Sequence, residues 1–283
     1  SFMQTRFSYL AAFLLDLTPG LIQQAHFATP ESTLTFFLFC SLLFTIKFIQ
    51  HAKTLYLILA SIFLGLAMGT KISSVTFLLP LTIILFIKSY PMNLAYKEPV
   101  LLVKQFIKAL LKLTKLMLIS TTIILLTLVI VAPFVFLDFP AFQGNLDYEG
   151  RLAMGKFSVF YTRQFIDTIP VLFQIEKILP FALGPILLLF SSLGFMLAVI
   201  NIIRKPKIEL IMFVLAFLSL FIPSAFLFAK WTRFIAPTFP FFAIFAAFLL
   251  NKLYSKSKYL SKFFTIILLI GTVLWTMSFF SIY

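Results

Sequence analysis

The chain has few of the residues that metal binding, disulfide formation and soluble folding require. Its 283 residues include one cysteine, Cys40, and two histidines, so it offers neither a disulfide framework nor a thiol metal site. Charged residues make up 11% of the sequence and hydrophobic residues 61%, with a mean hydropathy of +1.08, which excludes a soluble globular domain. Phosphate-binding glycine loops, nucleophile elbows, zinc signatures and N-x-S/T sequons are also absent from the sequence.

The sequence does contain a series of apolar runs long enough to cross a lipid bilayer. We predict nine spans: residues 7–24, 32–50, 54–70, 72–88, 116–136, 181–200, 208–228, 234–250 and 263–282. All should be helices, because in lipid only a helix or a closed barrel satisfies its own backbone. We therefore predict an all-α polytopic membrane protein with one transmembrane domain over residues 1–283. Since the chain begins with Ser1 and no charged leader precedes the first span, we expect this domain to be incomplete at its N-terminus.

The run from Thr54 to Lys88 must turn near its middle. As one helix, at about 1.5 Å per residue, it would be roughly 50 Å long, whereas the apolar core of a bilayer is about 30 Å thick. Its one internal charge is Lys71, and a lysine at mid-bilayer costs roughly 2.5 to 3.5 kcal/mol. The sequence therefore predicts a turn at Gly69-Thr70-Lys71, with Lys71 at a membrane surface.

Lysine and arginine collect in alternate gaps between the runs. One side receives Arg6, Lys47, Lys53, Lys88, Lys97, Lys104, Lys108, Lys112, Lys115, Arg204, Lys205, Lys207, Lys252, Lys256, Lys258 and Lys262. The other side receives Lys71, Arg151, Lys156, Arg163, Lys177, Lys230 and Arg233. The first side is predicted to be cytoplasmic, which places the N-terminus inside and the C-terminus outside. The formal charge of +14 then fits an anionic cytoplasmic leaflet, and no nucleic-acid partner is predicted.

Most of the nine acidic residues fall on the predicted outer side: Glu31, Asp138, Asp147, Glu149, Asp167 and Glu176. Glu98 and Glu209 lie inside, and Asp16 lies within the first run. An acid within a span is a functional candidate. We favour the alternative that Pro19-Gly20 ends this helix early and that Asp16 pairs with a residue outside this chain.

Two connections between runs are long enough to have structure of their own. In the cytoplasmic loop, residues 89–115, Lys104, Lys108, Lys112 and Lys115 recur at helical spacing, which predicts an amphipathic helix lying on the interface and anchored to anionic lipid. The outer loop, residues 137–180, mixes charged residues with aromatic ones. It fits either a segment lying on the outer leaflet or an ordinary aromatic belt with a solvated loop.

The richest motif is His26-Phe27-Ala28-Thr29-Pro30-Glu31-Ser32-Thr33, before the second run. Thr29 can cap a helix, Pro30 suits its first position, and Glu31 lies in the first turn, where the macrodipole favours a carboxylate. These local roles explain the motif without any function. The functional alternative is that His26 and Glu31 contact a substrate. His26 and His51 fall on opposite sides and cannot form one metal site.

The motif and two later ones together resemble a known family. The run from His26 to Leu34, followed by Gly65-Leu66-Ala67-Met68-Gly69-Thr70-Lys71, is similar to the dolichyl-phosphate-mannose protein mannosyltransferases and their bacterial relatives, the aminoarabinose transferases of lipid A. In that family an acid on the second outer loop is followed by a "GLA..TK" turn. The run from Arg233 to Pro240 is similar to the family's late "R(Y/F)..P..P" element. The matches extend over about residues 7 to 250, in the same order, and imply a GT-C-like fold.

The chain departs from the family pattern in two places. Pro30-Glu31 stands where the family usually has threonine and aspartate. The family's principal catalytic acid lies on the first outer loop, before any residue of this chain, so the resemblance leaves Glu31 an auxiliary role.

The resemblance implies transfer of a sugar from a polyprenyl-phosphate donor to a lipid, glycan or protein acceptor at the outer face of a bacterial inner or plasma membrane, with inversion. The predicted topology agrees, since a lipid-linked sugar can present its head at the outer leaflet. A phosphate leaving group needs cations rather than a strong acid. We predict that it is held by Lys71, Lys230 and Arg233, with Arg163 as the weaker candidate. An outer carboxylate must take the acceptor proton. For Lys71 and Arg233 the alternative is snorkelling at a helix end.

Asp147-Tyr148-Glu149 forms a D-x-E pair in the outer loop. In an extended segment its two carboxylates point to one side, where they can hold a divalent cation or a sugar amine. We predict that these three residues, with His26, contact acceptor or sugar, and we predict no metal ligand.

Other functions are compatible with the same runs. A secondary transporter or lipid flippase also has many spans and broken helices, but the sequence has no internal repeat and its charges concentrate at the predicted outer surface. An O-antigen ligase or polymerase, or a noncatalytic membrane scaffold, are further alternatives.

Overall fold

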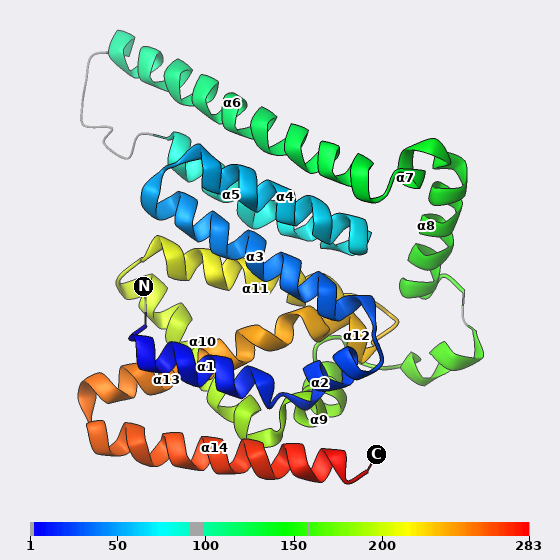
Figure 1. Cartoon of the computed structure of the whole chain (residues 1–283), viewed down its shortest axis with the longest axis vertical. Helices are drawn as coiled ribbons and strands as arrows, with labels where there is room; N and C mark the ends of the chain where they lie inside the picture. The colour runs from blue at the N-terminus through cyan, green and yellow to red at the C-terminus, as the bar shows by residue number, and fades with distance from the viewer. Residues whose placement is uncertain (1–2, 91–98, 158, 283) are drawn as a thin grey trace. The chain divides into compact units, whose positions relative to one another are not determined.

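The computed structural model describes residues 3–90, 99–157 and 159–282, and these residues form helices and no strand (Figure 1). The chain divides into two compact units. Unit 1 comprises Ser1–Thr35 and Gln143–Tyr283, and unit 2 comprises Phe36–Phe142.

Unit 1 contains eight α-helices of its own: α1 (Thr5–Asp16), α2 (Pro19–His26), α9 (Leu179–Leu183), α10 (Pro185–Arg204), α11 (Ile208–Phe226), α12 (Thr232–Ile235), α13 (Phe239–Lys256) and α14 (Lys258–Phe280). It also has three short turns: η2 (Phe160–Phe165), η3 (Gln174–Ile178) and η4 (Ala236–Thr238). Unit 2 contains α4 (Thr54–Thr70), η1 (Ile72–Phe77), α5 (Leu78–Ser89), α6 (Pro99–Val131) and α7 (Phe134–Leu137). Helices α3 (Pro30–His51) and α8 (Phe139–Ala153) run from one unit into the other.

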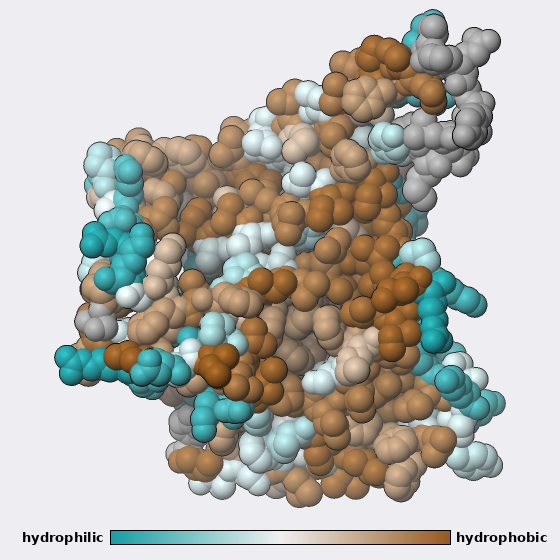
Figure 2. All heavy atoms as spheres, turned by 180° about the vertical axis from the view of Figure 1, so that it is seen from behind, coloured by the Kyte–Doolittle hydropathy of each residue, from teal (hydrophilic) through white to brown (hydrophobic). Residues whose placement is uncertain are grey.

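Among the described residues, seven helical segments are long and apolar enough to cross a membrane: Pro30–His51, Ile72–Ser89, Leu102–Val131, Pro185–Arg204, Ile208–Phe226, Thr232–Lys256 and Lys258–Phe280. Thr54–Thr70 is an apolar helix of shorter length. These helices confirm the prediction of an all-α multi-pass membrane protein. Large apolar side chains on α10 and α14, such as Met196 and Leu274, are exposed, as a lipid-facing surface requires, and apolar residues cover most of the face in Figure 2.

The first predicted span, residues 7–24, differs from the prediction, since it is divided into α1 and α2. Leu17 and Thr18 separate the two helices, and Pro19 is the first residue of α2. With 12 and 8 residues, neither helix is long enough to cross a bilayer by itself. Asp16 ends α1 and is exposed, in agreement with an early break at Pro19-Gly20.

The turn at Lys71 is confirmed. Helix α4 ends at Thr70, Lys71 has an extended backbone (φ −157°, ψ 119°), and η1 begins at Ile72. The segment expected to form a separate interfacial helix, residues 100–115, is helical but continues without a break into α6, which has 33 residues. Its place on a membrane interface stays a prediction. Lys97 and Glu98 lie outside the described residues.

Helix α13 forms the core of unit 1, with α1, α10 and α14 packed against it. The rings of Phe239, Phe241 and Phe245 are fully buried. Close packing against α10 requires Gly194, because a Cβ atom at this position would overlap the backbone of Phe245.

Contacts along this core define two ends of unit 1. The guanidinium carbon of Arg6, near the start of α1, lies 3.6 Å from the ring centroid of Tyr254, near the end of α13. Thr276, near the end of α14, donates from Oγ1 to the carbonyl of Leu17 at 2.6 Å. Helix α1 is therefore antiparallel to α13 and parallel to α14. The lysines at 252, 256, 258 and 262 share the end that carries Arg6.

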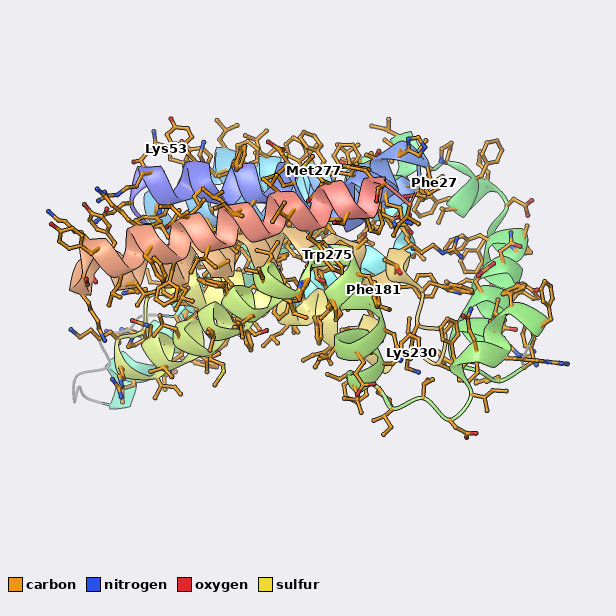
Figure 3. The ribbon with its side chains drawn as sticks, turned by 90° about the horizontal axis from the view of Figure 1, so that it is seen from below. Phe27, Lys53, Phe181, Lys230, Trp275 and Met277 are labelled. Atoms are coloured by element: carbon orange, nitrogen blue, oxygen red, sulfur yellow. The ribbon has the colours of Figure 1, made fainter. Side chains whose placement is uncertain are left out.

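The opposite end of unit 1 carries the connections around Phe27, Phe181 and Lys230. Trp275, near the end of α14, donates from Nε1 to the carbonyl of Phe181 at 3.1 Å, and Figure 3 shows Phe27, Phe181 and Lys230 toward the end at which α14 finishes. We call this the site end of unit 1. It collects residues that the charge pattern assigns to one side of the membrane.

In unit 2, the turn that carries Lys71 also lies at the opposite end from the other lysines that are in contact. Helix α4 lies parallel to α6, since the hydroxyls of Ser61 and Ser120 are 2.8 Å apart and a Cβ at Gly69 would overlap Val131 farther along both helices. Lys112 donates from Nζ to the carbonyl of Lys88 at 2.8 Å. The contact between Lys112 and Lys88 lies toward the starting end of α6, away from the level at which α4 ends.

Candidate functional site

Lys230 is the most deeply buried of the predicted site cations. It lies in the short connection between α11 and α12, with 4% of its surface exposed. Its Nζ donates to the carbonyl of Phe228 at 3.2 Å, and burial lowers the pKa of the amine. Among the described residues no carboxylate forms an ion pair with Lys230. An ammonium group has three donors, so this cation retains capacity for an anion.

Five aromatic side chains form a cluster beside Lys230: Tyr161, Phe165, Phe173, Phe228 and Trp231. Phe165 is central, with ring centroids 5.0 Å from Trp231, 6.4 Å from Phe228 and 5.7 Å from Phe173. Tyr161 lies 6.3 Å from Trp231. The cluster joins the predicted outer loop, residues 137–180, to the connection that carries Lys230. These rings supply apolar surroundings that disfavour a bare charge.

The backbone at the end of α8 also holds the Lys230 connection. The amide of Ala229 donates to the carbonyl of Ala153 at 3.1 Å. Gly155 has a positive φ of 73°, and a Cβ atom there would lie 2.6 Å from the ring of Phe228. Only glycine allows both the backbone conformation and the close approach.

Gln174 is a buried polar residue next to the same cluster. It begins the π-helical turn η3, is 1% exposed, and donates from Nε2 to the carbonyl of Ala225 at 3.2 Å. Its Oε1 is buried and has no hydrogen-bond partner in the described part of the chain. Neither Gln174 nor Trp231 was predicted from the sequence. The available signals were a lone amide within an apolar aromatic stretch and a tryptophan directly after a candidate lysine.

The two predicted arginines of unit 1 are exposed. Arg233 lies on α12, with its guanidinium carbon 5.4 Å from the ring centroid of Phe234. Arg163 lies on η2, two residues before Phe165. The contact of Phe165 with Trp231 therefore brings the segments of Arg163 and Lys230 together.

The His26 motif forms the junction of α2 and α3. Pro30 is the first residue of α3 and Glu31 lies in its first turn, as predicted. Thr29 donates from Oγ1 to Oε1 of Gln24 at 2.8 Å. Glu31 is 2% exposed, whereas His26 is exposed at the end of α2. Burial of a carboxylate at a helix N-terminus fits a structural as well as a functional role.

The predicted geometry of the D-x-E pair is wrong. Asp147, Tyr148 and Glu149 lie on α8 rather than on an extended segment. Residues two apart on a helix do not face the same side, so the carboxylates of this pair cannot chelate one ion together. Asp147 instead lies 3.6 Å from Arg151 one turn later. In the described residues no group of three or more histidine, cysteine or acidic side chains could hold a metal ion.

Lys71 belongs to unit 2. It is half-buried, and its carbonyl accepts hydrogen bonds from the backbone and hydroxyl of Ser74 at 3.0 and 2.9 Å. Its participation in one site with Lys230 stays a prediction.

Comparisons with known proteins give one family match and a similar fold. The family model for dolichyl-phosphate-mannose-protein mannosyltransferase matches residues 2–134. No curated protein sequence matches the chain. The apo oligosaccharyltransferase of Archaeoglobus fulgidus has a similar fold, with a TM-score of 0.55 and 14% identity over 98% of this chain. The same enzyme tethered through a disulfide bond to an acceptor peptide with the NVT sequon gives a TM-score of 0.57 and 15% identity over 97% of this chain.

The likeness to these structures is one of fold, at 14% and 15% identity. The chain spans only 42% and 40% of the two archaeal chains. Family match and fold nevertheless agree with the resemblance found in the motifs. The chain is therefore similar to the dolichyl-phosphate-mannose-protein mannosyltransferase family over residues 2–134, and its fold is similar to that of the archaeal oligosaccharyltransferase.

Proposed function

We propose that the chain serves a membrane enzyme that transfers a sugar from a polyprenyl-phosphate donor to a lipid, glycan or protein acceptor at the outer membrane face, with inversion. The observation that carries the proposal is the burial of Lys230 without a carboxylate partner among the described residues. A buried cation of this kind favours an anionic ligand. The name of the matched family supports a lipid-phosphate sugar as the donor.

In the proposed reaction an acceptor oxygen or nitrogen attacks the anomeric carbon from the face opposite the phosphate. The bond from carbon to the phosphate oxygen breaks, and its electron pair leaves with the lipid phosphate. Lys230 stabilises the developing charge, with Arg233, Lys71 and Arg163 as further cations. The acceptor proton goes to a carboxylate. Glu31 has an auxiliary role in orienting the acceptor.

Binding of undecaprenyl phosphate tests the role of Lys230. This chain has two tryptophans, and Trp275→Phe, with any tryptophan outside this chain also replaced by phenylalanine, leaves Trp231, beside Lys230, as the fluorescent reporter. We expect Lys230→Met to weaken binding by about 10-fold or more, because a charge-assisted hydrogen bond contributes roughly 1.5 to 3 kcal/mol.

The matched control is Lys256→Met, an exposed lysine at the other end of unit 1. It should leave binding unchanged. Equal affinity of the Lys230→Met variant and the unmodified protein would refute the proposed phosphate site.

A further inference from the structure

The aromatic cluster is bordered by two buried polar groups of complementary kind. Lys230 has unused donors, and Gln174 has an unused acceptor, Oε1. A buried acceptor that lacks a hydrogen bond destabilises the folded chain. No group among the described residues donates a hydrogen bond to Oε1, so the folded chain keeps a buried acceptor unpaired.

Both groups are attached to the same end of α11. The amide of Gln174 binds the carbonyl of Ala225, five residues before Lys230. The ring of Phe173 contacts Phe165, which contacts Phe228, whose carbonyl receives the Lys230 hydrogen bond. The segments that carry the acceptor and the cation are therefore joined through the same aromatic cluster.

The orientation of the Gln174 amide follows from its partner. Because Ala225 offers a carbonyl, the Nε2 donor must face it, and the other end of the amide presents an acceptor. Gln174 is the first residue of the π-helical turn η3, and π-helical turns are frequent at functional sites. A ligand group that meets Oε1 must carry a hydroxyl or amino hydrogen.

We propose that Gln174 recognises the donor sugar. In this arrangement Lys230 holds the phosphate of the lipid-linked sugar, and Oε1 of Gln174 accepts a hydrogen bond from a hydroxyl or amino group of the sugar ring. This inference rests on the proposed function. A site built to hydrogen-bond one polar group discriminates against ligands that lack it.

The test compares undecaprenyl phosphate with the same lipid carrying mannose, glucose or 4-aminoarabinose, again by the fluorescence of Trp231 in the Trp275→Phe protein. We expect at least one sugar-bearing lipid to bind about fivefold more tightly than the bare lipid, which corresponds to one hydrogen bond of about 1 kcal/mol. Gln174→Leu should remove this advantage and leave affinity for the bare lipid within about twofold. Gln174→Asn, which keeps the amide but withdraws it, should reduce the advantage.

The matched control is Gln164→Leu. Gln164 is an exposed glutamine of the same loop, and its amide donates to the carbonyl of Tyr161 at 3.0 Å. This variant should keep both affinities.

The outcomes separate the two proposals. Loss of the sugar advantage in Gln174→Leu, with bare-lipid binding retained, supports the inference. Three results would overturn it. The Gln174→Leu variant could keep the tighter binding of the sugar-bearing lipid, or the unmodified protein could lack this tighter binding. The Gln174→Leu variant could also lose affinity for both lipids equally. Unchanged bare-lipid binding in Lys230→Met would instead refute the phosphate site itself.

Discussion

At Lys230, burial and charge act against each other. The apolar cluster favours the neutral amine, which lowers the pKa of Lys230 below that of an exposed lysine. A bound phosphate favours the ammonium form and raises the pKa again. Occupancy of the site and protonation of Lys230 are therefore linked.

This linkage predicts opposite pH dependences for binding and stability. Above about pH 8 the lipid phosphate is fully ionised, so affinity for undecaprenyl phosphate should fall as pH rises through the lowered pKa of Lys230. Stability of the unliganded protein should rise over the same interval, because its unfolded state binds the proton more tightly. Titrations of Trp231 fluorescence and thermal unfolding from pH 8 upward measure both effects.

Lys230→Arg provides the control for the pH experiment. Arginine stays charged throughout this range, so binding by this variant should be nearly independent of pH. A parallel fall in affinity for both proteins would assign the effect to another group.

Among the elements, the packing of α4 against α6 positions the turn that carries Lys71. Gly65 and Gly69 lie one helical turn apart on the face of α4 that meets α6. A Cβ atom at Gly65 would lie 2.7 Å from the Cβ of Thr127 and 3.0 Å from the carbonyl oxygen of Ile124. Small residues at such positions let transmembrane helices approach closely.

A cross-link tests this packing. In a Cys40→Ser background, Ser61→Cys with Ser120→Cys should form a disulfide, since the native hydroxyls are 2.8 Å apart. Adding Gly65→Val should strongly reduce the yield, because the valine side chain separates the helices. Leu55→Val, at an exposed position of α4, should have no effect. Undiminished cross-linking with Gly65→Val would contradict the packing.

The element boundaries show what the sequence could predict. The turn at Lys71 followed from chain length against bilayer thickness, and the start of α3 at Pro30 followed from capping preferences. The extended geometry expected for the D-x-E pair was wrong, because Asp147 and Glu149 carry no local signal that distinguishes a strand from a helix in a polar loop, and their contact with acceptor or sugar stays a prediction. Hydropathy alone gave one span over residues 7–24, whereas Pro19-Gly20 predicted the early end of the first helix that the structure has.

At the scale of the whole molecule, the alternating charge pattern predicted which connections share an end within each unit. Contacts from Arg6 to Tyr254 and from Thr276 to Leu17 agree with it in unit 1. The proximity of Gln174 to the Lys230 connection could not be predicted, because 56 positions separate them and only tertiary contacts through Phe165 join their segments. The pattern of charges also assigns the site end to the outer membrane face, which is a separate claim.

Labelling with a membrane-impermeant maleimide tests that claim most directly. In the complete protein with every native cysteine, Cys40 included, replaced by serine, single cysteines are introduced by Arg233→Cys at the site end and by Lys256→Cys at the opposite end, both at exposed positions. We predict that intact cells label the position-233 variant from outside, and that the position-256 variant reacts only after the membrane is permeabilised. The reverse pattern would place the Lys230 site in the cytosol and contradict transfer from a lipid-linked donor at the outer face.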